Sequence, residues 1–394
     1  MELKSLITAK IALSRLDSPL VTFAFTTVFV SIFTFGMLHR SGFDASTFIT
    51  AGDTFCDPAI ASKNITVLKN NGGYDGQFYY RLALDPFTSR RTDFGVMLDV
   101  PSYRQQRILY PFLAWALSAG KPEFVPWWML GINYIALCLL GWLGALFART
   151  FKQHALWGIF LPLYPASLLT MTRDLVELLE VVLLISSLLA LRRGKHIWGA
   201  VLLTLAALTK ESALLVAPAA MMTYIIDWRA GRKERISWIY FTLPITAFLM
   251  WHTALLIKWG ELPAIASKMN LGKPFYGFIG FLLDTSALQT HLQRRSFREL
   301  ILLIIFTIGV VYCIRATSAS LHEKLSWVLY LILALSFSRV IWVEDWAFLR
   351  AISEFSALGI IIVIGAELRA RAIILGSFSL IWVYNFLRLL RHGD

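Results

Sequence analysis

Long apolar runs without charged residues recur along the chain, and they restrict its fold more than any other feature. The first run, residues 19–38, has the roughly 20 residues that a helix needs to cross a bilayer. Hydrophobic residues make up 57% of the chain and charged residues 16%, whereas soluble domains have about 45–50% and about 25%. Inside lipid, a helix satisfies its own backbone hydrogen bonds. The sequence therefore predicts an all-α, polytopic membrane protein.

We expect about 11 membrane-spanning helices in a single domain, residues 1–394. The predicted spans are residues 19–38, 124–148, 155–171, 175–191, 197–208, 213–226, 236–257, 299–314, 325–341, 352–368 and 372–387. Two of them, 197–208 and 213–226, are too short for a full bilayer. We therefore expect the membrane to be thin there, or the ends of these helices to line a cavity.

The lysine and arginine residues predict which side of the membrane each segment faces. Lys4, Lys10 and Arg15 precede the first span, and positive charge before a first span favours a cytoplasmic N-terminus. Residues 39–123 then form a large external loop, and residues 258–298 form a second one. Because the basic residues lie mostly in short clusters between apolar runs, the net charge of +12 indicates contacts with membrane lipids and not with nucleic acid.

The first loop contains one further apolar run, residues 105–119. This run is shorter than a span and contains Pro111, so we expect a helix that lies on the outer leaflet or dips into it. If the run crossed the membrane, the basic clusters after residue 148 would face the outside, which the charge rule disfavours. The loop is therefore predicted to stay on one side.

A polar stretch in this loop, residues 70–86, reads NNGGYDGQFYYRLALDP. Asp75 lies between glycines that permit tight turns, and the aromatic run after it suits a membrane surface. We interpret the stretch as an active-site loop with Asp75 as the leading candidate. Further candidates in it are Tyr74, Gln77, Tyr80 and Arg81. The alternative is a plain turn, because Gly and Asp are common turn formers.

More charged residues lie at predicted span ends on the side of this loop, which suggests one shared site. They are Arg104, Arg107, Arg173, Asp174, Lys210, Glu211, Glu344, Asp345 and Arg350. Plainer alternatives are a charged turn at residues 173–174, an internal ion pair at residues 210–211, and an Arg350 side chain that merely reaches from a span end to the surface.

Asp174, Glu177 and Glu180 recur every three residues, so they share one flank of a helix that enters the membrane. Carboxylates in apolar surroundings are unfavourable unless they are paired, and such residues are usually functional. Glu177 is therefore a further site candidate.

The histidine and cysteine residues predict no metal centre. The seven histidines have no spacing typical of metal ligands, and we assign no metal-binding residue. The three cysteines are scattered and form no disulfide framework. No cofactor follows from the sequence, and a divalent metal ion stays an open option.

Transfer of a sugar from a lipid-linked phosphate needs the groups that gather at this outer face. The acceptor hydroxyl must lose a proton as it attacks the anomeric carbon, which requires a positioned carboxylate base. The departing lipid phosphate is a weak base, so a second carboxylic acid is unnecessary, unlike in glycoside hydrolysis. Guanidinium groups suit the phosphate oxygens. We expect Arg104 or Arg107, with Lys210 and Arg350, to bind the donor phosphate.

Four motifs carry a family resemblance: YDGQFYYRLALDP at residues 74–86, RQQRILYPFLAW at 104–115, TRDLVELLE at 172–180 and LTKES at 208–212. With them the chain resembles the bacterial integral-membrane glycosyltransferases of the GT-C superfamily. More narrowly, it resembles the mannosyltransferase branch with the PIG-V type enzymes, and bacterial cell-surface glycopolymer proteins. The resemblance covers about residues 20–260 and is weaker afterwards. PIG-V type proteins have a Trp-Asp pair where this chain has Tyr74-Asp75, so the sugar stays open.

The resemblance implies roles for three residues and a donor. Asp75 matches the family's catalytic base, Lys210 the basic residue of a Thr-Arg-Ser type turn, and Arg350 in FLRAISE an arginine before a late span. The last match places Arg350 outside. Charge counting alone slightly favours an inverted C-terminal half with residues 275–288 as an extra short crossing. The implied donor is a polyprenyl-phosphate sugar.

The sequence thus predicts an enzyme of the bacterial inner membrane with its active site on the periplasmic side. It would transfer a sugar from a polyprenyl-phosphate donor, with inversion, to a glycan or lipid acceptor of the envelope. One alternative is an O-antigen polymerase or ligase, and another is a flippase for lipid-linked glycans. A flippase is expected to carry polar residues through the depth of its spans, whereas here they concentrate at one face.

Overall fold

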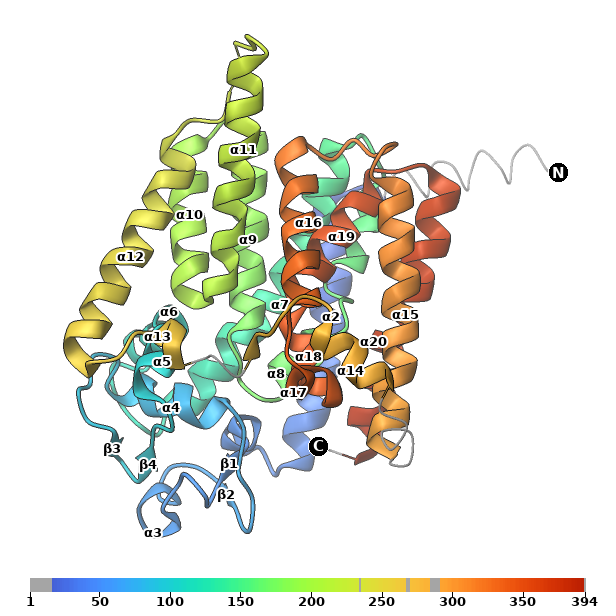
Figure 1. The fold of residues 1–394 in the computed structure, drawn as a ribbon. Helices are drawn as coiled ribbons and strands as arrows, with labels where there is room; N and C mark the ends of the chain where they lie inside the picture. The colour runs from blue at the N-terminus through green and yellow to red at the C-terminus, as the bar shows by residue number, and fades with distance from the viewer. Residues whose placement is uncertain (1–15, 234, 267–269, 284–290, 393–394) are drawn as a thin grey trace, which may run out of the picture.

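Helices form most of this protein, and the short strands lie in the first loop. The structure, a computed structural model, describes residues 16–233, 235–266, 270–283 and 291–392. Figure 1 shows long helices packed side by side, with the short helices and strands of the first loop in a layer across one end of the bundle.

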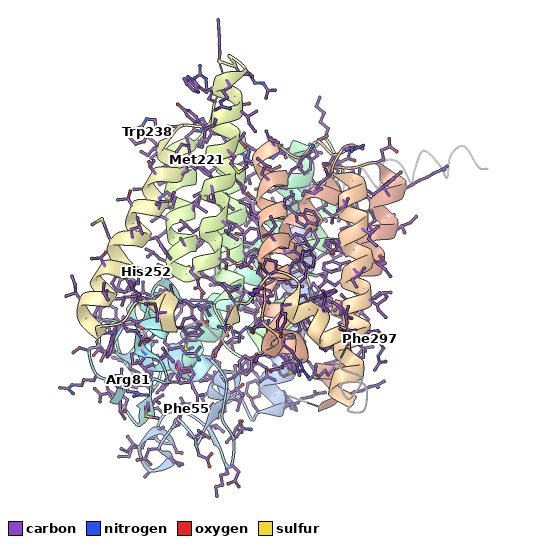
Figure 2. The ribbon with its side chains drawn as sticks, viewed as in Figure 1. Phe55, Arg81, Met221, Trp238, His252 and Phe297 are labelled. Atoms are coloured by element: carbon purple, nitrogen blue, oxygen red, sulfur yellow. The ribbon has the colours of Figure 1, made fainter. Side chains whose placement is uncertain are left out.

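Within the described residues, four helices are long and apolar enough to cross a membrane. They are α2 (Pro19–Arg40), α7 (Val125–Thr150), α12 (Ile239–Trp259) and α20 (Leu368–His392), the last over Arg369–Arg391. Their outward faces expose large apolar side chains such as Leu20 (70% exposed) and Met250 (69%). Trp238 (63%), just before α12, also points away from the bundle in Figure 2. Soluble proteins rarely expose such continuous apolar surface, so these faces suit lipid.

The other helices of the bundle are shorter or more deeply enclosed. They are α9 (Glu177–Arg192), α10 (His196–Thr209), α11 (Val216–Arg229), α15 (His291–Cys313), α16 (Leu321–Leu335) and α19 (Ser353–Ile364). All 12 residues of α19 are buried, and their length is about 18 Å. Because protein surrounds this helix, its length need not match the thickness of a bilayer.

The span predicted at residues 155–171 is wrong as a continuous helix. The chain forms the 3-10 helix η2 (Ala155–Phe160), a turn, and the five-residue α8 (Ser167–Met171). Pro162 and Pro165 lie in the turn, and proline cannot continue a helix because it lacks a backbone N–H. Each of the other predicted spans coincides with most of an α-helix. The number of membrane crossings stays a prediction.

The first loop, residues 39–123, is folded throughout. Its elements are η1 (Ala45–Ile49), β1 (Ala51–Gly52), α3 (Pro58–Ala61), β2 (Val67–Leu68), α4 (Gly76–Leu84), β3 (Thr92–Asp93), β4 (Val96–Met97), α5 (Pro101–Gln105) and α6 (Leu109–Leu117). β1 pairs with β2 in parallel, and β3 pairs with β4 antiparallel. Apolar side chains from η1, α4, α6 and the start of α7 form a core of their own beneath the bundle.

The helix predicted at residues 105–119 is shorter in the structure, because it is confined to α6 and follows a bend after α5. α5 ends at Gln105, and α6 begins at Leu109 after a bend. Pro111 lies in the first turn of α6, where the backbone N–H groups have no partner within the helix, so a proline is tolerated there. The nine residues of α6 measure about 14 Å, which is too short to cross a bilayer.

The end of α12 holds this bend in place. Three side chains of α12 donate hydrogen bonds to the loop: Trp251 Nε1 to Gln106 O (3.2 Å), Lys258 Nζ to Phe87 O (2.9 Å) and Trp259 Nε1 to Gln105 Oε1 (2.7 Å). His252, labelled on α12 in Figure 2, lies 3.2 Å from the Gln106 amide. The loop is therefore fixed to the bundle on the side of α12.

The predicted second loop, residues 258–298, holds α13 (Pro263–Ala266) and α14 (Tyr276–Leu283), and residues 267–269 and 284–290 are outside the described ones. The eight residues of α14 measure about 12 Å, so the described part of the possible crossing at 275–288 is too short to span. Beside α14 lie α17 (Arg339–Val343) and α18 (Asp345–Ala351), at the same end of the bundle as the first loop (Figure 1).

Candidate functional site

Asp75 occupies the position before α4, but its side chain does not cap that helix. An aspartate at this position usually accepts a hydrogen bond from the first turn. Here the carboxylate turns away from α4 towards the bundle. The glycine after it makes this approach possible, because a Cβ on Gly76 would lie 2.4 Å from the carbonyl oxygen of Arg173 and 2.6 Å from that of Ile49. The plain-turn interpretation leaves the direction of the carboxylate unexplained.

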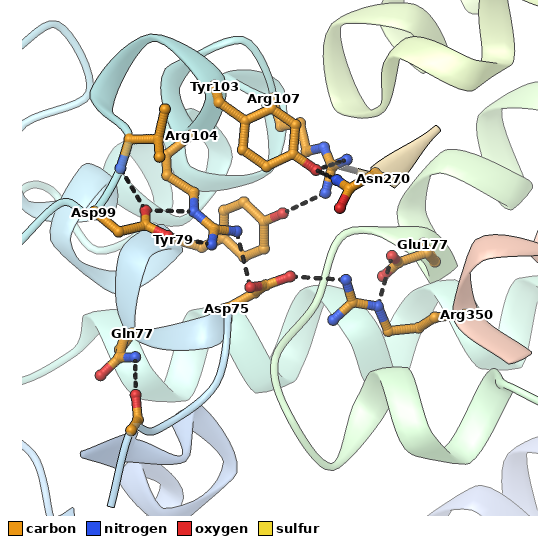
Figure 3. A network of polar contacts seen from close by, with 12 residues as sticks. Asp75, Gln77, Tyr79, Asp99, Tyr103, Arg104, Arg107, Glu177, Asn270 and Arg350 are labelled. Carbon is orange, nitrogen blue, oxygen red and sulfur yellow. Dashed lines mark hydrogen bonds and ion pairs between the residues drawn. The ribbon is translucent and has the colours of Figure 1, made fainter. Parts of the chain in front are cut away.

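Two arginines from distant segments hold the Asp75 carboxylate (Figure 3). Arg104 Nη1, from α5, donates to Oδ1 at 2.8 Å, and Arg350 Nη2, from α18, donates to Oδ2 at 2.7 Å. Each arginine has a second carboxylate partner. Arg104 contacts Asp99 at 2.8 and 2.7 Å, and Arg350 Nε lies 3.2 Å from Glu177 Oε1.

These arginines decide the ionisation of Asp75. Burial alone would raise the pKa of this carboxyl, but the charges of Arg104 and Arg350, and the hydrogen bond from Arg350, hold its pKa well below the usual value. The side chain is 20% exposed, so solvent reaches part of it. Asp75 is therefore a firmly ionised carboxylate, and in this arrangement it is a weak base.

Arg107, in the bend between α5 and α6, makes its own set of contacts. It forms a bidentate pair with Glu211 at 2.9 and 2.6 Å. Its guanidinium also donates to the hydroxyls of Tyr79 and Tyr103, each at 3.0 Å. Bidentate pairs are the strongest form of this interaction, so Arg107 is held firmly.

Lys210 pairs with Glu354 across the bundle. Its Nζ lies 3.0 Å from Oε1 of Glu354, which also accepts a hydrogen bond from Ser212. Both members of the ion pair are buried. A buried pair is destabilising to break, because the remaining charge has no compensation.

All four cations predicted to bind a donor phosphate thus have a carboxylate partner already. Arg104 has Asp75 and Asp99, Arg107 has Glu211, Lys210 has Glu354, and Arg350 has Asp75 and Glu177. An anionic ligand would have to compete with these carboxylates.

A cavity of about 420 Å³ opens beside this network. One part of its wall is charged, with Arg107, Glu177, Lys210, Glu211 and Arg350. The rest is largely apolar, with Leu215, Phe248, Leu271, Leu333, Phe337 and Ile341. Asp75 and Arg104 do not line it, but Arg350, which does, contacts the Asp75 carboxylate (Figure 3). The cavity can therefore take a molecule that has both a charged group and an apolar chain.

Three predicted candidates of the active-site stretch face away from this network. Gln77 accepts a hydrogen bond from Gly52 N and donates one to Gly72 O, which ties the loop together. Tyr80 lies in the apolar core under the bundle. Arg81, buried in the loop layer (Figure 2), contacts Thr88 at 3.1 Å and Asp93 at 3.8 Å. These three side chains stabilise the loop.

Asp174 is also outside the network. It is completely buried and lies beside Asn133, and burial raises its pKa well above the usual value. Its backbone is left-handed (φ 46°), a conformation that Asp tolerates better than most residues. Asp174 is therefore a buried residue of the turn before α9 and does not belong to the network around Asp75.

Tyr74 and Arg173 form the border of the site. The Tyr74 ring lies 4.7 Å from the Arg173 guanidinium and 5.1 Å from that of Arg350. Burial raises the pKa of Tyr74 to about 12, so its hydroxyl stays neutral. Arg173 also stacks on Trp346 at 4.1 Å, and Glu344 lies close enough to both Tyr74 and Arg173 to affect their ionisation. The side chain of Asp345 is outside the described ones.

Sequence reasoning missed Asp99 and Tyr103 as members of the network, and it placed Glu354 at the outer face beside Arg350 without predicting its partner. Asp99 comes before a helix and had no distinguishing pattern. Glu354 follows Arg350 by four residues, a spacing that on one helix favours a pair between them. The chain instead changes from α18 to α19 at Ile352, so Glu354 reaches Lys210.

No metal-binding group is found in the described part of the chain, where no three His, Cys, Asp or Glu side chains come together as ligands. No protein-family model, no curated protein and no solved structure matches this chain. The resemblance to the GT-C superfamily therefore stays a prediction from the four motifs.

Proposed function

We propose that this protein is an integral-membrane glycosyltransferase. It would move a sugar from a polyprenyl-phosphate donor to a glycan or lipid acceptor of the cell envelope. The observation that carries the proposal is the cavity with one charged and one apolar part, beside which the Asp75 carboxylate lies. A soluble nucleotide-sugar donor has no apolar chain that would contact the apolar part of the wall.

The residues take the following roles in this proposal. Arg107, Lys210 and Arg350 line the cavity and bind the phosphate of the donor. Asp75 accepts the proton of the acceptor hydroxyl as that oxygen attacks the anomeric carbon. Arg104 does not line the cavity and acts as a positioning residue, because it fixes the carboxylate of Asp75 and is itself fixed by Asp99.

The location follows from the same proposal. The first loop and α18 lie at one end of the bundle (Figure 1), and the positive charge before the first span supports an orientation with that end outside the cytoplasm. We propose a bacterial inner-membrane protein with about 11 spans and a periplasmic site. Lipid-linked sugars would reach the cavity from the membrane.

Mass analysis tests the proposal. A strain that lacks this protein should accumulate a polyprenyl-phosphate sugar, and expression of the full chain should remove it. The purified full chain in liposomes should then convert that lipid into polyprenyl phosphate and a glycosylated acceptor. The acceptor mass should increase by one sugar.

Other outcomes point to the other functions. A lipid-linked glycan that changes leaflet without a change in mass would mean a flippase. A product that gains a whole oligosaccharide would mean a polymerase or ligase. If no lipid-linked sugar accumulates and none is converted, the proposed activity is wrong.

A further inference from the structure

The cations beside the cavity are neutralised, and this has a consequence for any anionic ligand. Five carboxylates, those of Asp75, Asp99, Glu177, Glu211 and Glu354, face Arg104, Arg107, Lys210 and Arg350. A phosphate placed among them without rearrangement would add a negative charge to a partly buried site that already has more carboxylates than cations. Binding therefore requires that at least one cation exchanges its partner.

Arg350 is the cation best placed to exchange. It lines the cavity, whereas Arg104 does not. It divides its contacts between Asp75 and Glu177, with one at 2.7 Å and one at 3.2 Å. Arg107, in contrast, holds Glu211 with two short bonds and two tyrosine hydroxyls besides.

We propose that the phosphate of a lipid-linked ligand takes Arg350 from Asp75, and that this exchange turns Asp75 into an effective base. The inference rests on the proposed function and deepens it. Before the ligand binds, Arg350 donates a hydrogen bond to Oδ2 of the carboxylate and screens its charge. Once Arg350 turns to the phosphate, one oxygen of Asp75 loses its hydrogen bond and becomes available to the acceptor.

The transfer step balances with these groups alone. The acceptor hydroxyl oxygen forms a bond to the anomeric carbon while its proton moves to Asp75. The bond from the anomeric carbon to the phosphate oxygen breaks, and its electron pair leaves with the polyprenyl phosphate. Arg350, already on the phosphate, stabilises the charge that develops there.

After the exchange, Asp75 faces fewer cations. Arg104 and Arg107 remain as charged neighbours, with Tyr74 and Tyr79 as neutral ones. The loss of Arg350 removes both a charge and a hydrogen bond that favour the ionised form, while burial continues to favour the protonated one. The carboxylate is then a stronger base when donor is present than when it is absent.

Binding of farnesyl phosphate to the purified full chain tests the exchange without any transfer. Asp75→Asn removes the carboxylate that competes for Arg350, so it should bind this probe about tenfold more tightly than the wild type. Arg350→Ala should bind it about tenfold more weakly. In the double variant the gain from Asp75→Asn should vanish, because it requires Arg350.

Asp99→Asn is the matched control. It removes a carboxylate of the same network that pairs with Arg104 away from the cavity, and its affinity should change by less than about threefold. Farnesol and inorganic phosphate serve as further probes. If inorganic phosphate shows the same tenfold gain, the site takes free phosphate, and the lipid chain is not required for the exchange.

The exchange is overturned if folded Asp75→Asn binds farnesyl phosphate with wild-type or lower affinity. If that variant does not fold, Glu177→Gln, which releases Arg350 from its other partner, must show the gain instead. The outcome is separable from that of the proposed function. Tighter binding without any sugar transfer would leave the exchange standing and reject the enzyme, and transfer without tighter binding would do the reverse.

Discussion

Asp75 is the residue on which the site depends, because it joins segments that are far apart in the sequence. Its carboxylate lies between Arg104, 29 residues further on, and Arg350, 275 residues further on. The residue type and its place in a glycine-rich turn indicated a functional carboxylate. The sequence placed Arg104 and Arg350 at the same face as Asp75, but their direct contacts with its carboxylate followed only from the fold.

Asp75→Asn should lower sugar transfer by about 10²- to 10⁴-fold, because loss of a general base typically has this effect. The amide keeps the shape of the side chain and removes its ability to accept the proton. Transfer by the purified variant, measured with saturating donor, gives the result. Asp85→Asn, on the same loop and without a contact to Arg104 or Arg350, is the control and should keep wild-type activity. Full activity of Asp75→Asn would exclude it as the base.

The pH dependence of transfer should differ between free and donor-bound protein. Asp75 must be ionised to accept a proton, so the rate falls as the pH drops through its pKa. In the free protein this pKa lies well below the usual value, and it rises when Arg350 moves to the donor. The acid limb of kcat should therefore lie about one pH unit or more above that of kcat/KM for the donor. Coincident acid limbs would contradict this.

The cations themselves could be found from the sequence, whereas their neutralisation could not. Arg107, Lys210 and Arg350 were predicted to share one face because each stands at the end of an apolar run. Pairing depends on side-chain reach between helices, which has no periodic signature. The candidates Gln77, Tyr80 and Arg81 do not contact the Asp75 network. All three lie in α4, whose side chains pack within the first loop, whereas the Asp75 carboxylate lies just before α4 and points towards the bundle.

At the scale of elements, the apolar runs correctly predicted which segments are buried or face the membrane. They did not predict where a helix is interrupted. The run at residues 155–171 is apolar enough for a span, but Pro162 and Pro165 interrupt it. The run at residues 105–119 divides at a bend that brings Arg107 to the cavity. Prolines lie at the break of the first run, whereas the bend of the second run precedes Pro111, which lies within α6; hydropathy alone predicts neither interruption.

The junction between the active-site stretch and α4 should be sensitive to a single methyl group. Gly76→Ala would place a Cβ within 2.6 Å of the backbone carbonyl oxygens of Arg173 and Ile49, so the backbone at this junction must shift. We expect a loss of stability of about 1–3 kcal/mol and a large loss of transfer. Thermal unfolding of the purified variant measures the first effect.

Gly72→Ala is the control for this variant, since a Cβ there meets no atom within 4 Å and the backbone is not left-handed. Its unfolding temperature should equal that of the wild type within a degree or two, on the order of the small effects seen for surface substitutions. If both variants unfold at the wild-type temperature, the close approach of Gly76 to the bundle is not present in the protein.

At the scale of the whole molecule, the two ends of the bundle are held together by different segments. The first loop and the end of α20 lie at one end, where Arg40 Nη1 donates to Leu389 O at 3.3 Å. The C-terminus of α9 meets the N-terminus of α16 at the other end, through the pair Arg192 and Glu323. The fold class, largely helical with long apolar helices, could be predicted from composition. The number of crossings could not, because short enclosed helices such as α19 do not need bilayer length.

Cysteine labelling should assign the two ends to the two sides of the membrane. Background labelling of the native cysteines should be low, because Cys56, Cys138 and Cys313 are all buried. Cysteines placed at the exposed positions Ser62 and Arg391 should react with a membrane-impermeant reagent from outside intact cells. A cysteine at exposed Lys195 should react only after permeabilisation. Labelling of Lys195→Cys in intact cells would invert the proposed orientation.

Every cation that lines the cavity is paired with a carboxylate, and this predicts which kind of inhibitor should bind. A purely anionic compound, such as a phosphonate with an isoprenoid tail, must displace a carboxylate and leave it without a partner in a partly buried place. A zwitterion with an ammonium group next to its phosphonate would bring a replacement partner for that carboxylate. We expect the zwitterion to bind more tightly than the anion of the same length, the reverse of the order at an open basic pocket, where the extra positive charge would weaken binding.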